Sequence, residues 1–174
     1  MNMNDALEVL YNRRSIRRYQ SEQISREKLD SVIRAGVCAA SGKNGQSAII
    51  IAVQDKQTRD ELSRLNAAVL GVKADPFYGA PTVLIVLAEA NSPYAVQDGS
   101  LVLGNLMNAA KAVGLGSCWI NRAKEVFDSD EGKALLKKWG VDGEWIGVGN
   151  CILGYPAEDP AMKPRKENFV YYVL

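Results

Sequence analysis

Short apolar runs alternate with amphipathic segments along most of this sequence. Three runs, AIIIAV at 48–53, TVLIVLA at 82–88 and WIGVGNCIL at 145–153, are bounded by turn residues, which is typical of buried strands. A shorter strand is expected at 117–120. The closing FVYYVL is too apolar for a solvated tail, so we predict that it adds a strand to a sheet, either that of its own chain or that of a partner.

The polar segments between these runs carry apolar residues at helical spacing. Ser25 is suited to cap a helix, because Leu29 and Val32 follow it at the intervals of one helix face. Other helices are predicted at 6–11, 56–70, 92–113 and 130–139, the last three each closed by a glycine. Interleaved helices and strands indicate an α/β or α+β fold. No repeat or linker divides the chain, and its 174 residues fit one domain over 1–174.

The sequence contains no histidine. This absence excludes Ser-His-Asp and Cys-His catalysis, most zinc sites and haem held by histidine, and we predict no metal site. If the protein is an enzyme, its chemistry is expected to come from a cofactor. Lys and Arg total 21 against 20 Asp and Glu, so an anion site has to come from local clustering and not from net charge.

The cysteines and the apolar runs bear on location. Three widely spaced cysteines do not read as a disulfide framework, which favours a reducing environment. The first ten residues lack the basic-then-apolar order of a signal peptide, and the apolar runs are too short to cross a bilayer. We therefore expect a cytoplasmic protein that binds neither membrane nor nucleic acid.

Residues 13–19, RRSIRRY, place four arginines within six positions. Their guanidinium groups repel one another, so they are stable together either in solvent or around an anion. Guanidinium forks match phosphate oxygens, and Ser15 can donate a further hydrogen bond. From charge alone, a solvated basic turn is the more frequent case.

Three further segments carry candidate binding residues. Residues 40–46 (ASGKNGQ) lie between a helix and a strand, where α/β proteins often bind ligands, although an ordinary connection is the alternative. Residues 114–120 (GLGSCWI) let the backbone approach a flat ligand, or they are a helix stop followed by a core strand. Residues 163–166 (KPRK) form a second basic group, for which a solvated tail is the commoner interpretation. Cys118 has no visible activator, so we expect it to be packed and not nucleophilic.

Taken together and in order, these segments resemble the nitroreductase family of flavoproteins over nearly the whole chain. RRSIRRY is similar to the family's entry motif for flavin and phosphate, and AASGKNGQS is similar to its flavin-contacting loop, usually Pro-Ser-x-x-Asn-x-Gln-Pro. FYGAPTVLIVLA, GSLVLGNLMNAAKAVGLGSCWI and KPRKENFVYYV resemble its later landmarks. Ala40 and Ser47 stand where the family usually has proline, which bears on the substrate pocket more than on flavin binding.

The resemblance implies an α+β fold in which helices flank a central, mostly antiparallel sheet. It also implies a homodimer with two equal sites for flavin mononucleotide (FMN), each built from both chains. The cofactor-binding residues implied in this way are Arg13, Arg14, Ser15 and Arg17 on the phosphate, ribityl chain and pyrimidine edge, Lys163 and Arg165 on the phosphate, Cys118, Trp119 and Ile120 beside the ring chiefly through their backbone, Ala40, Ser41, Gly42 and Asn44 from the other subunit, and Asn66 as a further polar contact to the ring.

The activity implied by the resemblance is oxidoreduction. NADH or NADPH would reduce the FMN and leave, and a small acceptor such as a nitroaromatic or a quinone would then take the electrons in a ping-pong sequence. Reduced flavin carries negative charge near its pyrimidine edge, so a fixed cation such as Arg17 would stabilise it, and no catalytic side chain is required. Two alternatives stay open: a flavoenzyme of the same fold with another reaction (dehalogenation, enone reduction or flavin breakdown), or a non-catalytic module that binds flavin or another anion.

Overall fold

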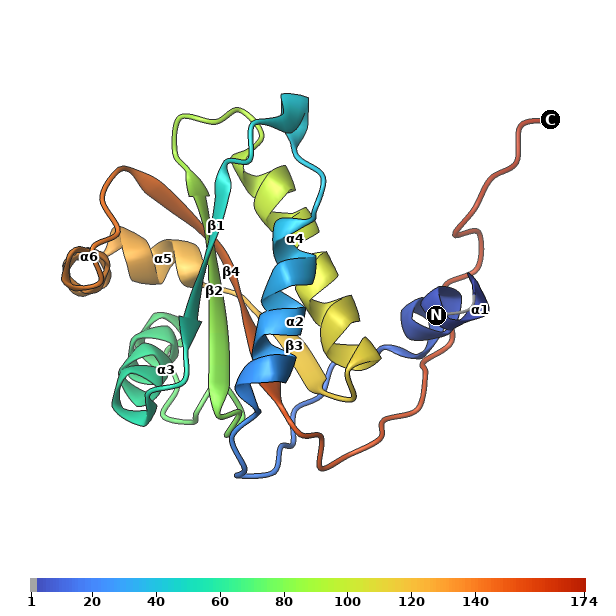
Figure 1. The fold of residues 1–174 in the computed structure, drawn as a ribbon, viewed down its shortest axis with the longest axis horizontal. Helices are drawn as coiled ribbons and strands as arrows, with labels where there is room; N and C mark the ends of the chain where they lie inside the picture. The colour runs from blue at the N-terminus through green and yellow to red at the C-terminus, as the bar shows by residue number, and fades with distance from the viewer. Residues whose placement is uncertain (1–2) are drawn as a thin grey trace.

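One antiparallel sheet runs through the middle of the molecule (Figure 1). The computed structural model describes residues 3–174. The strands of the sheet, in the order β1-β2-β4-β3, are β1 (Ala48–Val53), β2 (Thr82–Glu89), β4 (Trp145–Gly154) and β3 (Gly116–Ile120). Every neighbouring pair is antiparallel, which confirms the α+β fold and the antiparallel sheet that the resemblance implied.

Helices cover both faces of this sheet (Figure 1). One face carries α3 (Lys56–Leu70), α5 (Ala123–Asp128) and α6 (Asp130–Lys138), and the other carries α2 (Arg26–Val37) and α4 (Ala95–Ala112). Outside these layers, beside the C-terminal segment, lies α1 (Met3–Asn12). The loop before β1 contains one 3₁₀ turn, η1 (Gly42–Asn44).

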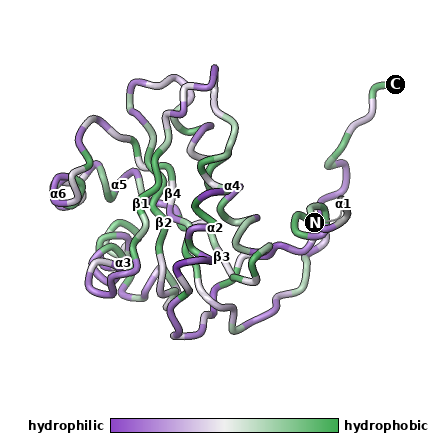
Figure 2. The backbone as a smooth tube through the Cα atoms, viewed as in Figure 1, coloured by the Kyte–Doolittle hydropathy of each residue, from purple (hydrophilic) through white to green (hydrophobic). Residues whose placement is uncertain are grey.

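The central strand β2 explains why there are two helical layers. All of its residues except the last are buried, so both of its faces are covered. Side chains alternate between the two faces of a strand. Val83, Ile85 and Leu87 pack in the core formed with α3, α5 and α6. Leu84 and Val86 pack in the core formed with α2 and α4. Figure 2 shows apolar residues concentrated along the strands and on the helix faces toward them.

The bounds of the predicted strands are confirmed to within one residue, and the helix predicted at 56–70 has those bounds. The caps are also as expected: the Ser25 hydroxyl accepts the Lys28 N–H at the start of α2, and Gly71 ends α3 in the left-handed conformation. The helix expected from 92 begins instead at Ala95. α5 is not among the predicted helices, since six residues are too few to show a helical period.

The C-terminal segment corrects one expectation. Residues 169–174 form no strand with the sheet of their own chain, and Tyr171 and Tyr172 are each 82% exposed. Figures 1 and 2 show this apolar end leading away from the sheet beyond α1. The stretch before it contains three prolines, which cannot donate to a sheet ladder. Of the two alternatives, only pairing with a partner's sheet stays as a prediction.

A carboxylate anchors the loop between α3 and β2. Asp75 accepts hydrogen bonds from Arg59 Nη2 at 2.6 Å and from Ser63 Oγ at 2.5 Å. It also accepts the N–H groups of Phe77 at 2.9 Å and Gly79 at 2.7 Å. Burial by itself would raise the pKa of Asp75, but these hydrogen bonds outweigh it and lower the pKa below its ordinary value.

We expect Asp75→Asn to lower the free energy of unfolding at pH 7 by about 1–2 kcal/mol, because hydrogen bonds to a charged group stabilise and Asp75 is partly solvated. A carboxylate with a lowered folded-state pKa stabilises the fold above its unfolded pKa, and this contribution is lost as pH falls through the folded pKa. The difference from the native chain should therefore shrink below about pH 4. Urea unfolding at neutral and acidic pH measures it. The exposed control Asp30→Asn should change stability by under about 0.5 kcal/mol, and an equally small effect of Asp75→Asn would contradict the anchor.

Candidate functional site

The basic segment 13–19 lies along the outer edge of β3. Ser15 forms a parallel bridge with Ser117, and the Ile16 N–H donates to the Ser117 carbonyl at 2.9 Å. Glycine at position 116 permits this approach, because a Cβ there would lie only 3.0 Å from the Ile16 side chain. The structure therefore brings together two of the predicted segments, 13–19 and 114–120.

Tyr19 locks the end of the basic segment. Its hydroxyl donates to the Ile16 carbonyl at 2.6 Å, and its side chain packs against the core on the α3 side of the sheet. Burial, and secondarily the nearby Cys118 and Cys151 thiols, raise the pKa of this phenol above its ordinary value, so it stays a hydrogen-bond donor. The segment before it is held in place at both ends.

The start of the C-terminal segment joins the same surface. The Gln20 N–H donates to the Tyr155 carbonyl at 2.9 Å, and the Ala157 N–H donates to the Arg18 carbonyl at 2.9 Å. Glu158 then accepts the Arg17 N–H on its Oε1 at 2.5 Å. The predicted basic residues Lys163 and Arg165 follow a few positions later and are exposed.

Beyond Ser117, the outer edge of β3 has backbone N–H and C=O groups that no described neighbouring strand covers. In an antiparallel ladder, successive residues direct their N–H and C=O groups to alternate sides. Ser117 faces the basic segment, so Trp119 faces the same side. Among the described residues, the segment makes no backbone hydrogen bond to Trp119, and the Ile16 carbonyl accepts the Tyr19 hydroxyl. The Trp119 carbonyl has a 3.6 Å contact from the Cys118 thiol, a weak donor.

Three buried side-chain atoms around this region have no hydrogen-bond partner among residues 3–174: Arg13 Nη1, Asn66 Oδ1 and Trp119 Nε1. Such atoms are rare because an unpaired buried polar group costs about 1–3 kcal/mol, and more when charged. Asn66 uses its amide to hold the Asn121 carbonyl, just after β3, at 2.8 Å. Arg13 is the most informative of the three, because a guanidinium calls for an anion or a carbonyl oxygen.

The other predicted arginines point elsewhere. Arg14 donates from Nη1 to the Tyr11 carbonyl at 2.7 Å and the Arg13 carbonyl at 2.8 Å, so it caps the end of α1. The guanidinium of Arg17 is exposed and lies 6.0 Å from the centre of the Tyr78 ring. Arg13 and Arg17 thus keep charge available next to β3, whereas Arg14 is partly committed to the backbone.

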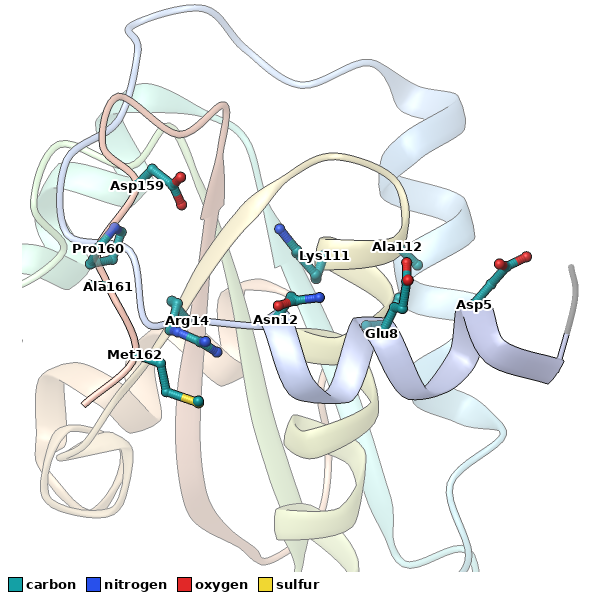
Figure 3. Close-up of a pocket in the computed structure, with 11 residues that line it drawn as sticks. Asp5, Glu8, Asn12, Arg14, Lys111, Ala112, Asp159, Pro160, Ala161 and Met162 are labelled. Atoms are coloured by element: carbon teal, nitrogen blue, oxygen red, sulfur yellow. The ribbon is translucent and has the colours of Figure 1, made fainter. Parts of the chain in front are cut away.

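A cavity of about 760 Å³ opens between α1, the end of α4 and residues 159–162 (Figure 3). Its lining includes Arg14 and Lys111, but also the carboxylates of Asp5, Glu8 and Asp159. Three carboxylates beside two cations do not suit a phosphate dianion, since like charges repel at short range. We therefore place the candidate site at the neighbouring β3 edge and not in this cavity.

One predicted loop lies at the opposite end of the sheet. It holds Ala40, Ser41, Gly42 and Asn44. The Glu89 N–H donates to the Ser47 carbonyl at 2.9 Å, and Glu89 pairs with Trp145 at the start of β4. Ser117 pairs with Leu153, near the end of β4. Positions 145 and 153 are eight residues apart, or about 26 Å at 3.3 Å per residue. In one chain, this loop and the Ser15–Ser117 bridge therefore lie at opposite ends of the sheet.

Two residues that sequence analysis did not single out hold this loop: Asp98 of α4 and Tyr94, the N-cap of that helix. Asp98, only 3% exposed, accepts the Gly42 N–H and the Ser47 hydroxyl, both at 2.8 Å. The Tyr94 ring covers Gly42 so closely that a Cβ there would lie 2.3 Å from it. The available signal was that Asp98 is the single acidic residue of α4. No signal pointed to Glu158.

Cysteine chemistry has little support in the described part of the chain. Cys118 and Cys151 are buried on opposite faces of the sheet, and burial raises the pKa of the Cys151 thiol. The packed position expected for the Cys118 side chain is confirmed. Within residues 3–174, no three potential His, Cys, Asp or Glu ligands converge on a common point. No helix there has the length and apolar character needed to cross a membrane.

Several known proteins are similar to this chain over nearly all of it. An Archaeoglobus fulgidus protein, whose name pairs NADH dehydrogenase with NAD(P)H nitroreductase, is 31% identical over 173 residues, covering 96% of this chain and 94% of the relative. The NAD(P)H-dependent FMN reductase of Bacillus subtilis is 26% identical, covering 94% of this chain and 70% of the relative. The crystal structure of a nitroreductase with bound FMN from Bacteroides fragilis matches with a TM-score of 0.88 at 29% identity, covering 99% of this chain and 100% of the other.

The family model described as the nitroreductase family matches residues 10–71 and 64–155. These residues include all four described strands and the helices on both faces of the sheet. The fold match to the Bacteroides fragilis nitroreductase agrees with this family assignment. The chain therefore belongs to the nitroreductase family.

Proposed function

We propose that this protein is an FMN-dependent oxidoreductase that passes electrons from NADH or NADPH to a small acceptor, such as a nitroaromatic or a quinone, by a ping-pong mechanism. The observation that carries the proposal is the buried Nη1 of Arg13, which has no partner among the described residues and belongs to the segment paired with β3. A relative named as an FMN reductase and another crystallised with FMN support the choice of ligand. The free cysteines support a reducing, cytoplasmic setting.

The groups around the β3 edge fit the parts of FMN. Arg13 and Ser15 offer a guanidinium and a hydroxyl to a phosphate or ribityl oxygen. Lys163 and Arg165 supply further cations from the C-terminal segment, which starts against the same surface. The Trp119 N–H and C=O, with the neighbouring backbone of β3, match a ring edge that both donates and accepts hydrogen bonds. Bound there, FMN would supply the hydride and electron transfer chemistry.

The remaining residues orient this site and set its charge. Arg17 belongs to the segment beside the β3 edge, and its exposed guanidinium offers a positive charge, which would favour an electron-rich ligand. Asn66, 1% exposed, leaves its Oδ1 free for an N–H donor while its amide holds the Asn121 carbonyl. None of these roles needs a side chain that exchanges a proton near neutral pH, which agrees with a chain that has no histidine.

We further propose a C2 homodimer in which each FMN site combines the basic segment and β3 of one chain with the 40–44 loop of the other. The separation of about 26 Å along β4 supports this assembly, because it sets the loop far from the Ser15–Ser117 bridge of its own chain. A two-fold interface uses one surface twice and gives two equal sites. Val37 on α2 and Val96 and Leu101 on α4 are apolar and exposed, and they provide contact surface for a second copy.

The apolar C-terminal end fits the same assembly. β1 is an edge strand, half-buried over most of its length, and its outer side pairs with no described strand. An unpaired edge readily accepts an added strand. We propose that residues 169–174 of one subunit pair with β1 of the other, which would bury side chains that are exposed in the single chain.

The purified protein should be yellow and carry about one FMN per chain, because each chain supplies one β3 edge. Extraction followed by chromatography identifies and counts the flavin. Under anaerobic conditions, NADH or NADPH should bleach its absorbance, and a screen of acceptors should restore it. A colourless protein that cannot be reconstituted, or one that holds the dinucleotide form, would contradict the proposal.

Arg13→Ala and Arg165→Ala should each weaken FMN binding by about 1.5–3 kcal/mol, the range for a hydrogen bond to a charged group. Titration of the apoprotein with FMN measures this loss. Arg26→Ala removes an arginine from an exposed ion pair on α2 and should leave FMN affinity unchanged. If both test variants bind FMN with native affinity, Arg13 and Arg165 are solvated side chains that do not contact the phosphate.

Two defective variants should repair one another in a mixed dimer. One chain carries Arg13→Ala with Arg17→Ala, and the other carries Ser41→Trp with Asn44→Ala. In a heterodimer both defects fall in one site and the second site has neither, so co-refolding a 1:1 mixture should restore about a quarter of all sites. Light scattering should give about twice the 19.0 kDa chain mass. A monomer that retains FMN at high dilution, or no recovery in confirmed heterodimers, would refute the shared site.

A further inference from the structure

α4 carries a buried carboxylate that forms no ion pair within residues 3–174. Asp98 lies in the first turn of the helix and is 3% exposed. Its two oxygens accept separate donors from the loop before β1: Oδ1 takes the Gly42 N–H and Oδ2 takes the Ser47 hydroxyl. A lone buried carboxylate is costly, and only good hydrogen bonds and the positive end of the helix offset that cost. The loop and Asp98 therefore stabilise each other.

The loop has fewer close contacts on one side. A cavity of about 160 Å³ is lined by the loop residues Ala40, Ser41 and Gln46 together with Ile50 and Val102. Atoms that border a cavity lack neighbours there, so the polar bonds from Asp98 and the Tyr94 ring over Gly42 carry more of the loop's position.

The loop is also strained, so it would not keep its shape unaided. Lys43, Asn44 and Gln46 have φ angles of 51°, 56° and 51°, a region that L-residues rarely adopt. Inside the loop, the Gln46 N–H donates to Ser41 Oγ at 3.1 Å, and its side-chain amide donates to Asn44 Oδ1 at 3.3 Å. The orientations of Ser41 and Asn44 are therefore coupled to the two ends that Asp98 holds.

We propose that Asp98 is a positioning residue for the FMN site of the opposite subunit. It does not touch the flavin; it holds Gly42 and Ser47 so that Ser41 and Asn44 are presented in one arrangement. This inference rests on the proposed function and on its shared site. It makes α4 a link between the exposed apolar contact surface at Leu101 and the loop that completes the partner's site.

Asp98→Ala should raise the dissociation constant for FMN about tenfold, since both loop bonds are lost. Asp98→Asn keeps an acceptor for the Gly42 N–H and an amide that can donate to Ser47, so it should stay within about threefold of the native value. Ser129→Ala removes the N-cap of α6, far from this loop in the sequence, and controls for a general loss of stability. It should leave FMN affinity unchanged. Native affinity in a folded Asp98→Ala dimer would overturn the proposal.

Mixing shows in which subunit Asp98 acts. When Asp98→Ala is co-refolded with the Arg13→Ala Arg17→Ala chain, a native-affinity phase of about a quarter of the sites should appear, because both defects fall in one site. If Asp98 served the site of its own chain, each site would carry one defect and no such phase would appear. The Ser41→Trp Asn44→Ala mixture is the reference. If the reference mixture recovers and the Asp98→Ala mixture does not, the role of Asp98 is overturned and the shared site stands. If neither mixture recovers, the shared site itself is overturned. If Asp98→Ala does not fold, Ser47→Ala replaces it. Ser47→Ala should also weaken FMN binding, and the outcomes are interpreted in the same way.

Discussion

The length of the antiparallel strands is the constraint on which the rest of this molecule depends. β2 and β4 are buried over most of their length and cannot slip by one residue without moving apolar side chains to the wrong face. Their extent keeps the basic segment at one end of the sheet and the 40–47 loop at the other. This separation is the geometric support for the proposal that a second copy completes the site.

The proposed site at β3 offers backbone groups more than reactive side chains. Within the described residues, the parallel bridge at Ser15 is not followed by a second one, so the Trp119 backbone faces an open edge. Close packing at Gly116 brings the arginines to that edge. The buried, unpaired nitrogen of Arg13 is a cost that the fold carries without a ligand. Such a site suits a cofactor that brings its own chemistry.

The agreement between sequence and structure is close for strongly patterned elements and weaker elsewhere. Strands such as 48–53 and the helix 56–70 follow from local patterns, because burial and capping are encoded within a few residues. α5 is too short to show a period. The end at 169–174 is apolar enough to predict burial, but not to say which chain buries it. Arg14 has the same charge as Arg13, yet its bonds to the end of α1 could not be read from charge alone.

The sequence by itself determined the order of the elements, the absence of histidine chemistry, the clustering of arginines at 13–18 and the family that the ordered motifs resemble. These are properties of local composition and spacing, so they can be recognised without knowing any contact between distant residues. Only the tertiary structure decided that Ser15 meets Ser117, that the 40–47 loop lies about 26 Å from that point, and that Asp98 holds this loop. The reason is that each depends on the register between strands far apart in the chain, and register is set by how side chains pack on both faces of the sheet.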